Sequence, residues 1–374
     1  MTVDRFEIYR DRLPSPADRD LIRLVFGSSF DADSFDRWAL GIEFDEIGPN
    51  GIRLLSELDL RLGRDKFHHP LRPRIAGVHR RTVYVNRLLL HRGAALAGRI
   101  AEKTGVDAVV VGGAARYLRG DETGLARPFG SFDLLLPPGV DRTQLAAAVA
   151  GGERLAVVRS VAGAEVIEDD YGFRYRLLFG LEPYVAGDLE TRALRVSFED
   201  RQLRVISAED DLFEAIWRGM DPRQDPGGMW LADALGLAGG SAPIDWTLVA
   251  DLARRHGAAE PVAAALGLLA EEGVASPELR AARDMLAATS ERWGDRMAMR
   301  LRTRPRAGAL GLAGRLGLTF LGESRRAGRR PGPRGFLAFL AARWGTSTPG
   351  ETIAAASARL RRHVRVGGRG GSSR

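Results

Sequence analysis

Residues 109–136 hold the side chains whose types and spacing could do chemistry. An apolar run ends in Gly112 and Gly113, and about 18 residues later a second apolar run begins around Ser131 and Asp133. Two glycines after a strand let backbone N–H groups approach a phosphate without a Cβ in the way. Side chains at i and i+2 of a strand share one face, so Ser131 and Asp133 would point the same way. A pair of carboxylates in this arrangement would hold a divalent cation on a nucleoside triphosphate, a geometry that suits nucleotidyl transfer.

Elements predicted on both sides would position these side chains. Residues 105–207 alternate between short β-branched runs and helical patterns, which indicates a small sheet with helices packed against it. Apolar residues recur at helical spacing before residue 104 and again after residue 208. We therefore predict an α+β fold, with a mixed sheet core at residues 105–207 between a helical N-terminal region at 1–104 and a helical C-terminal domain at 208–300. The predicted helices include residues 17–26, 51–62, 81–103, 114–118, 141–149, 212–217, 228–237, 246–255, 261–272 and 276–292, and the predicted strands include residues 107–111, 132–136, 155–161, 171–179 and a hairpin within 195–206.

Composition narrows the classes of protein that this chain could be. It has 374 residues, 45% hydrophobic and 28% charged, which allows several globular domains and excludes disorder throughout. It has no Cys, which excludes disulfides, thiolate nucleophiles and Cys-ligated zinc, and its six His show no metal-ligand spacing. No apolar run reaches the roughly 18 residues of a transmembrane segment, and residues 1–12 lack the apolar core of a signal peptide. We therefore expect a cytoplasmic location.

Charge is distributed unevenly along the chain. Lys and Arg total 55 against 48 acidic residues, a net charge of +7. Residues 301–374 hold 16 Arg and two acids, so this Arg/Gly-rich basic tail carries +14 and the first 300 residues carry −7. Within it we predict a linker at residues 324–335 and a basic helix at 351–364. Three interpretations of the tail stay open: a solvated extension, a contact with a polyanion or a protein partner, and a helix on a membrane surface.

Residues 112–136 also follow a distinctive order of small, aromatic and acidic positions. The chain reads Gly112-Gly113-Ala114-Ala115, Tyr117 and then Arg127-Pro128-Phe129-Gly130-Ser131-Phe132-Asp133-Leu134-Leu135-Leu136. This order resembles the motif of the uncharacterised bacterial nucleotidyltransferase family of the polymerase-β-like superfamily, which runs Lys-Gly-x-Ala, a Tyr, and then Arg-Pro-x-x-Asp-Ile-Asp-Leu-Leu-Val. Similar blocks at residues 51–55, 80–90, 230–233, 244–246 and 252–257 extend the resemblance over about residues 20–275.

The resemblance implies a nucleotidyltransferase-type core and a metal-dependent reaction. A member of this family would transfer a nucleotidyl group from a Mg²⁺-bound NTP to a hydroxyl acceptor. Carried over position by position, Gly112, Gly113 and Arg127 would bind the nucleotide. Asp133 would bind the metal, and Ser131 and Asp133 would occupy the two catalytic positions of the strand.

Two departures from the family pattern favour an alternative without catalysis. Ser131 stands where the family has its first metal-binding carboxylate. The strand expected to carry the third acid, residues 173–178, offers arginines instead. A neutral hydroxyl is a weak ligand for Mg²⁺. The alternative is an inactive nucleotidyltransferase-fold protein, a pseudoenzyme, that binds a nucleotide or a protein partner.

The same residues also have purely structural interpretations. The two glycines could form a tight strand-to-helix turn, and Arg127 could stabilise the loop before the second strand. Asp133 could be a capping or salt-bridged residue at a strand start. A displaced third acid could still come from one of four carboxylates, Glu165, Glu168, Asp169 and Asp170.

Overall fold

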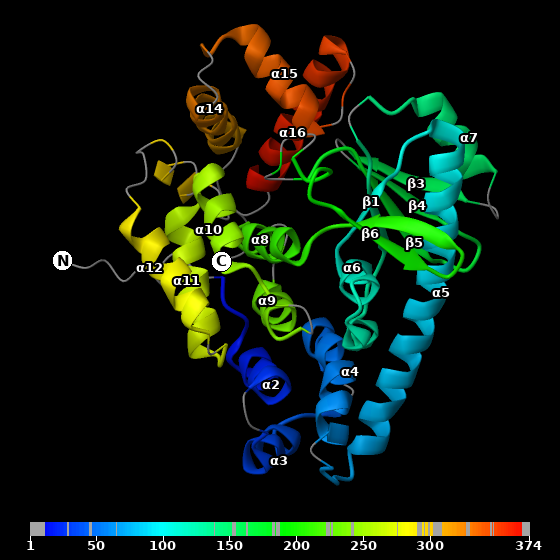
Figure 1. Ribbon diagram of the computed structural model, residues 1–374, viewed down its shortest axis with the longest axis vertical. Helices are drawn as coiled ribbons and strands as arrows, with labels where there is room; N and C mark the ends of the chain where they lie inside the picture. Colours follow the sequence, from blue (N-terminus) through cyan, green and yellow to red (C-terminus); the bar gives the residue numbers. More distant parts are fainter. Residues whose placement is uncertain are drawn as a thin grey trace.

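In the computed structural model, helices precede and follow a single mixed sheet (Figure 1). The structure describes residues 12–27, 30–44, 47–64, 66–137, 139–151, 155–161, 164–181, 184, 188–221, 225, 227–240, 243–274, 276–289, 294, 296–297, 300–301, 309–326, 330–344, 346 and 348–368. The α+β class predicted from the sequence is therefore confirmed, with helical regions on both sides of a mixed sheet.

The first part of the chain forms four described helices, of which the second, at residues 32–40, was not predicted from the sequence. These are α2 (Pro16–Phe26), α3 (Ala32–Leu40), α4 (Pro49–Arg64) and α5 (Arg72–Thr104). Ser15 caps α2, because its Oγ accepts a hydrogen bond of 3.2 Å from a backbone N–H of the first turn. α5 is longer than the helix predicted at 81–103 and ends where Gly105 adopts a φ of 68°. Within α5, a Cβ at Gly93 would lie 2.2 Å from Cγ of Phe132, so this glycine lets the helix lie directly on the sheet.

The sheet contains seven strands among the described residues, in the order β3-β4-β5-β2-β1-β7-β6. They are β1 (Val109–Val111), β2 (Phe132–Leu135), β3 (Ala156–Val161), β4 (Ala164–Glu168), β5 (Arg174–Leu178), β6 (Leu194–Phe198) and β7 (Arg201–Val205). β1 runs antiparallel to β2, whereas β2 runs parallel to β5 and β1 parallel to β7. Between β1 and β2 lie α6 (Gly113–Leu118) and the 3₁₀ helix η2 (Glu122–Ala126), and α7 (Arg142–Ala150) follows β2. The predicted strands and the 195–206 hairpin are present, and β4 is a strand that the sequence pattern did not reveal.

Among the described residues, five helices lie between the sheet and the tail. They are α8 (Ala208–Gly219), α9 (Trp230–Ala238), α10 (Trp246–Arg255), α11 (Ala259–Glu271) and α12 (Pro277–Ala288). Ser207, Asp245 and Ser276 cap α8, α10 and α12 through their side-chain oxygens. One continuous cluster of buried apolar side chains extends from α2 through the sheet to α12. This shared core fixes the N-terminal helices, the sheet and the C-terminal helices against one another.

The basic tail is helical where the structure describes it. It contains α14 (Ala309–Arg326), α15 (Pro333–Trp344) and α16 (Pro349–Gly368). Leu316, Leu340 and Trp344 form a small hydrophobic cluster that is separate from the main core. The interpretation of the tail as a structureless extension is therefore wrong for these ranges, although the predicted basic helix is present as part of α16. The linker predicted at 324–335 overlaps the end of α14 and the start of α15, and residues 327–329 lie outside the described residues.

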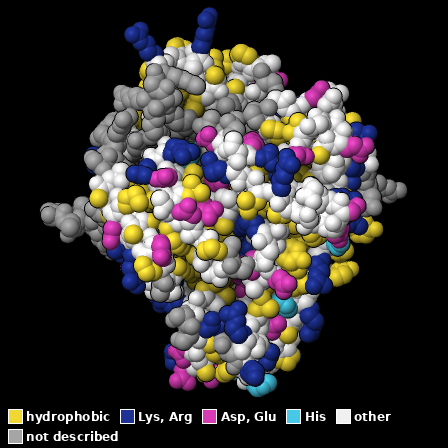
Figure 2. All heavy atoms as spheres, in the orientation of Figure 1, with side chains coloured by type: hydrophobic (Ala, Val, Ile, Leu, Met, Phe, Trp, Pro, Cys, Tyr) yellow, Lys and Arg dark blue, Asp and Glu magenta, His cyan; other side chains and the backbone are white. Residues whose placement is uncertain are grey.

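Side-chain charges on the described surface of the body are mixed. Figure 2 shows acidic and basic side chains interspersed over the face turned to the viewer. Arg330 and Arg334, at the start of α15, are both exposed. The near balance on the body fits the net charge of −7 of its first 300 residues, against +14 for residues 301–374.

Candidate functional site

The Gly112 turn and Asp133 lie together at the ends of two paired strands. β1 and β2 are in a register that places Val111 opposite Asp133. Gly112 has a φ of 73°, a conformation that side chains with a Cβ rarely adopt, and a Cβ there would lie 3.1 Å from Oδ2 of Asp133. The structure thus brings together the two features that the sequence marked as a site, the glycine turn and the carboxylate.

The two neighbouring positions of the motif support this arrangement. The Ser131 hydroxyl donates a hydrogen bond of 2.7 Å to Oδ1 of Asp133. Gly113 begins α6, and a Cβ there would lie 2.9 Å from Cδ1 of Phe129. Gly113 therefore lets the loop before β2 pack closely on α6, which is a structural reason for this glycine.

An arginine faces Asp133 from the adjacent strand. β5 pairs in parallel with β2, and the register places Arg176 opposite Asp133. Nε of Arg176 lies 2.6 Å from Oδ1 of Asp133, and Nη2 contacts Oδ2, so the guanidinium grips both carboxylate oxygens. The Arg176 side chain is 48% exposed and the Asp133 side chain 6% exposed. We call Gly112, Ser131, Asp133 and Arg176 the Asp133 cluster.

Helix α8 adds a second ion pair next to this cluster. Nε of Arg218 lies 3.4 Å from Oε2 of Glu214, within one turn of the helix. The pKa of Arg176 is raised by its hydrogen bonds to Asp133 and, to a smaller extent, by the negative charge of Glu214. Burial raises the pKa of the Glu214 carboxyl, and Arg218 opposes this rise. The guanidinium groups of Arg176 and Arg218 and the carboxyl group of Glu214 therefore surround Asp133.

The candidates for a displaced third acid are engaged by other groups. Glu165 pairs with an arginine of α7 at 3.3 Å, and Glu168 pairs with Arg174 at 3.1 Å. Asp169 is buried, where it accepts hydrogen bonds from the Tyr175 hydroxyl at 2.8 Å and from an arginine of α5 at 3.0 Å. Asp170 is exposed. Three of the four candidate acids are thus held in ion pairs away from Asp133.

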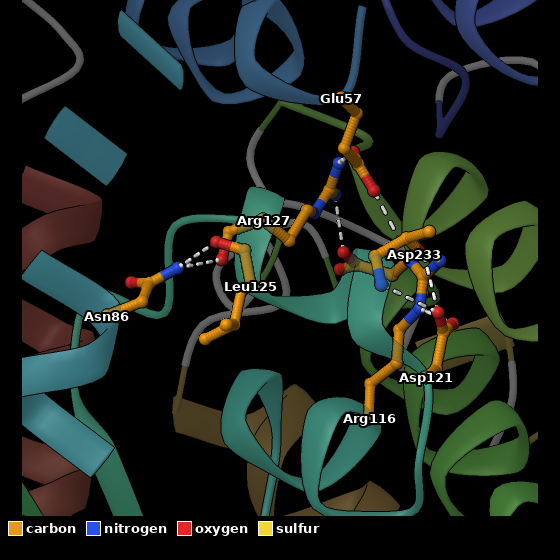
Figure 3. A network of polar contacts seen from close by, with 8 residues as sticks. Glu57, Asn86, Arg116, Asp121, Leu125, Arg127 and Asp233 are labelled. Carbon is orange, nitrogen blue, oxygen red and sulfur yellow. Dashed lines mark hydrogen bonds and ion pairs between the residues drawn. The ribbon is translucent and has the colours of Figure 1, made fainter. Parts of the chain in front are cut away.

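Arg127 lies in a buried network of ion pairs that joins three parts of the chain (Figure 3). Its Nη1 lies 3.0 Å from Oε2 of Glu57 on α4, and its Nη2 contacts Oδ1 of Asp233 on α9. Arg116 on α6 reaches Glu57 at 3.2 Å and Asp121 at 2.5 Å. We call these five residues the Arg127 network. The side chain of Arg127 is 7% exposed, and its predicted contact with a nucleotide phosphate stays a prediction.

Charges within this network stabilise one another strongly. Burial alone would lower the pKa of the Arg127 guanidinium, but the charges of Asp233 and Glu57 outweigh it and raise that pKa. Burial would likewise raise the pKa of Asp233, but its arginine neighbours hold that pKa well below its usual range. Both groups are therefore charged in the folded protein over the whole physiological pH range.

Asn86 on α5 fixes the loop that leads into β2. Its Nδ2 donates to the carbonyl oxygens of Leu125 and Arg127 at 2.7 and 2.8 Å, and its Oδ1 accepts from the N–H of Phe129 at 3.2 Å (Figure 3). The side chain is buried, so these three bonds satisfy backbone groups that water does not reach. Residue 86 lies within the block 80–90 of family resemblance, but the motif implies no role for it. The sequence does contain a signal for such a role, because Asn86 is a polar residue at an otherwise apolar position of a long helix.

The groups around Asp133 do not match a magnesium site. Asp133 contributes one carboxylate, both of whose oxygens are already bound by Arg176, and Ser131 contributes a neutral hydroxyl. Mg²⁺ in proteins is held by carboxylates together with substrate phosphates. Over the part of the chain that the structure describes, no group of three or more His, Asp or Glu side chains is placed to hold a metal ion.

Comparisons with known protein families, with curated proteins and with solved structures give no match. The resemblance to the nucleotidyltransferase family therefore stays a prediction from the sequence motif. Among the described helices, none is both long enough and apolar enough to cross a membrane.

Proposed function

We propose that this chain is a nucleotidyltransferase-fold protein that has lost metal-dependent transfer and acts by binding a nucleotide or a protein partner. The observation that carries the proposal is the ion pair between Asp133 and Arg176. It occupies the position at which the resemblance places the catalytic metal.

The strand arrangement supports the nucleotidyltransferase part of the proposal. The glycine turn follows β1, and the motif aspartate lies on β2, which is antiparallel to β1. β5 lies beside β2, and its residue 176 is opposite Asp133. A third acid of the family would have to come from such a neighbouring strand, and this chain has an arginine at that point.

Electrostatics supports the loss of metal-dependent transfer. Two unit charges 4 Å apart interact by about 4 kcal/mol near a protein surface. A divalent cation at Asp133 would therefore be repelled by Arg176 and would also have to compete with it for the carboxylate oxygens. Arginine itself binds phosphate, so the half-exposed Arg176 leaves the cluster suited to an anion without a metal.

Calorimetric titration of ATP and GTP, with and without Mg²⁺, tests this proposal. We expect no gain of NTP affinity from Mg²⁺ in the natural protein, because Arg176 neutralises Asp133. The double variant Ser131→Asp/Arg176→Asp restores three acids, and we expect Mg²⁺ to raise its NTP affinity at least about tenfold. Ser131→Asp alone should give a smaller gain, because Arg176 remains.

A matched control separates the site from net charge. Ser131→Asp/Arg174→Asp changes the charge equally, but Arg174 pairs with Glu168 on the neighbouring strand. This control should show a gain no larger than that of Ser131→Asp alone. Mg²⁺-dependent labelling of an acceptor by the natural protein, abolished in Asp133→Ala, would show that the protein is an active transferase. NTP binding without Mg²⁺ supports a nucleotide ligand, whereas no NTP binding by the natural protein supports a protein partner.

The charge of residues 301–374 favours a second function, contact with a polyanion. This region carries +14, and Arg330 and Arg334 are exposed at the start of α15. Binding to a single-stranded RNA of mixed sequence should weaken steeply between 50 and 200 mM salt, by about a hundredfold or more for several phosphate contacts. Affinity that does not change with salt would exclude this contact.

A further inference from the structure

A cavity of about 860 Å³ lies between the N-terminal and C-terminal helices. α2, α4, α9 and the start of α10 contribute its walls, together with the loop of η2. None of its lining residues belongs to the Asp133 cluster. Pockets for small molecules in proteins span about 300–1,000 Å³, so this cavity is large enough for one.

The floor of the cavity is formed by an arginine that the protein itself neutralises. Arg116 donates to Asp121 at 2.5 Å and to the Thr123 hydroxyl at 2.7 Å. A Cβ at Gly236 would lie 2.4 Å from Nη1 of Arg116, so the glycine of α9 lets the guanidinium lie beneath the helix. A Cβ at Gly240 would lie 3.4 Å from Oδ2 of Asp121. The floor is therefore fixed in place, and its charges are paired before any ligand arrives.

One side of the cavity is apolar and one edge is cationic. The apolar wall contains Phe26, Leu235, Ile244 and Trp246. Of these, Leu235 and Trp246 are buried, and the other two are partly buried. Arg61 and Arg64, in the last turn of α4, line the same cavity from another side, and the Arg64 side chain is exposed. The acids of the lining are engaged: Asp121 by Arg116, Glu57 by Arg116 and Arg127, and Glu278 by the Ser276 hydroxyl at 2.7 Å.

We propose that this cavity binds a small organic anion with a flat apolar body. The body would lie against Phe26, Leu235 and Trp246, and a carboxylate, sulfonate or phosphate ester group would lie at Arg61 and Arg64. An apolar wall and a pair of arginines that line the same cavity suit such a molecule, because arginine pairs with planar anions and the apolar surface is already shaped. The inference is independent of a nucleotide at the Asp133 cluster.

Two fluorescent probes that differ by one sulfonate test the proposal. 8-Anilinonaphthalene-1-sulfonate carries an anion and an aromatic body, and N-phenyl-1-naphthylamine has the same body without the charge. We expect saturable binding of the anionic probe to the folded natural protein, and weaker binding of the neutral one. Arg61→Gln/Arg64→Gln should weaken the anionic probe by about fivefold to tenfold with little effect on the neutral probe.

Two further variants locate the binding. Ile244→Trp adds bulk to the wall and should weaken both probes at least about tenfold while the melting temperature stays within a few degrees. Arg80→Gln/Arg81→Gln, which removes two exposed arginines from α5, should leave both affinities unchanged. Equal binding of the two probes, or equal losses in the two arginine double variants, would overturn the anion assignment. Unchanged binding in a folded Ile244→Trp would show that the probes bind elsewhere.

Discussion

The Asp133 cluster and the Arg127 network each contain an arginine paired with carboxylates, but the two arginines differ in exposure. In the cluster, the Arg176 side chain is 48% exposed and a single carboxylate faces it. In the network, the side chains of Arg127 and Glu57 are 7% and 5% exposed, and the arginine serves two acids on different helices. When an ion pair with one half-exposed member is broken, water can partly replace the lost partner, whereas breaking a pair that is buried on both sides leaves an uncompensated charge away from water.

The difference assigns the two regions different tasks. The Arg127 network connects α4, the loop before β2 and α9, so its loss should loosen the whole fold. The Asp133 cluster lies at strand ends, where Arg176 changes the charge of a site while the backbone geometry around Gly112 is kept. Substitutions in the network should therefore change stability, and substitutions in the cluster should change what the site binds.

The largest expected effect is that of Arg127→Met. The methionine has a similar length but leaves Glu57 and Asp233 without their shared partner, which should lower the free energy of unfolding by about 3–5 kcal/mol. Arg176→Met, the matched change at the half-exposed arginine, leaves the nearly buried Asp133 carboxylate with a hydrogen bond from the Ser131 hydroxyl, and should lower it less, by about 1–3 kcal/mol. Urea unfolding at pH 7 followed by circular dichroism measures both. Equal losses in the two variants would contradict the division between network and cluster.

Asn86→Ala should have the next largest effect. It removes the partners of two carbonyl oxygens and one N–H in the buried loop before β2, which should cost about 2–4 kcal/mol of unfolding free energy. Asn86→Asp keeps the acceptor for Phe129 but brings a charge toward two carbonyl oxygens, so it should be no more stable than Asn86→Ala. Thermal and urea unfolding of both variants test this. A loss below 0.5 kcal/mol in Asn86→Ala would show that the loop is held by other contacts.

The pH dependence of stability should reveal the carboxyl group of Asp233. Its pKa is held below the usual range in the folded protein, so its contribution is complete above the unfolded pKa of about 3.9 and is lost as the pH falls toward the folded value. The difference in unfolding free energy between the natural protein and Asp233→Asn should therefore be largest near pH 7 and shrink below about pH 4, by about 2 kcal/mol.

Other carboxyl groups do not obscure this measurement. Burial raises the pKa values of Asp211, Glu214 and Asp225, which makes the fold less stable as the pH rises through those values. Burial, the largest cause of these shifts, is the same in both proteins, so most of their contribution cancels in the difference, and only the smaller part due to the charge of Asp233 is removed in Asp233→Asn. A difference that stays constant from pH 7 to pH 3 would contradict the assignment to Asp233.

Local patterns in the sequence predicted most helices and strands of the body, though not α3 or β4, and they marked the glycine turn and Asp133 as one site. Ser15 and Ser207 cap their helices through contacts within one turn, which is the range that a local pattern can describe. The partners of Arg127 could not be read in this way, since Glu57 and Asp233 are 70 and 106 residues away in sequence. The sequence showed that arginines lie on the strand at 173–178, but only the β2–β5 register shows that Arg176, and not Arg174, faces Asp133.

Two helices of the tail, α14 and α15, escaped prediction for a different reason. Arg, Gly and Pro lie among and between their apolar residues, and this composition is typical of linkers. The helices nevertheless meet through Leu316, Leu340 and Trp344, which come from α14 and α15, with Ala355 and Ala356 of α16 packed against them. The sequence of any one of these helices does not predict this cluster, because its residues come from two helices and are supported by a third.

Removal of residues 302–374 should have the smallest effect on the body. The cluster of the tail is separate from the main core, so the truncated protein should keep one cooperative melt and lose less than about 1 kcal/mol of unfolding free energy. Some loss is expected, because Glu351 at the start of α16 interacts with the charge of Arg142 on α7. Salt-dependent affinity for RNA should disappear in the same variant, because the region of +14 is gone.

Truncation inside the tail sharpens this expectation. Removing residues 324–374 would take away α15 and α16 but keep most of α14, which would expose Leu316. This shorter deletion should therefore be more prone to aggregate than removal of the whole unit, although it retains more of the chain. Light scattering and calorimetry on the two truncations distinguish the cases. If removal of residues 302–374 abolishes the cooperative melt, the tail is part of the main fold and its hydrophobic cluster is not independent.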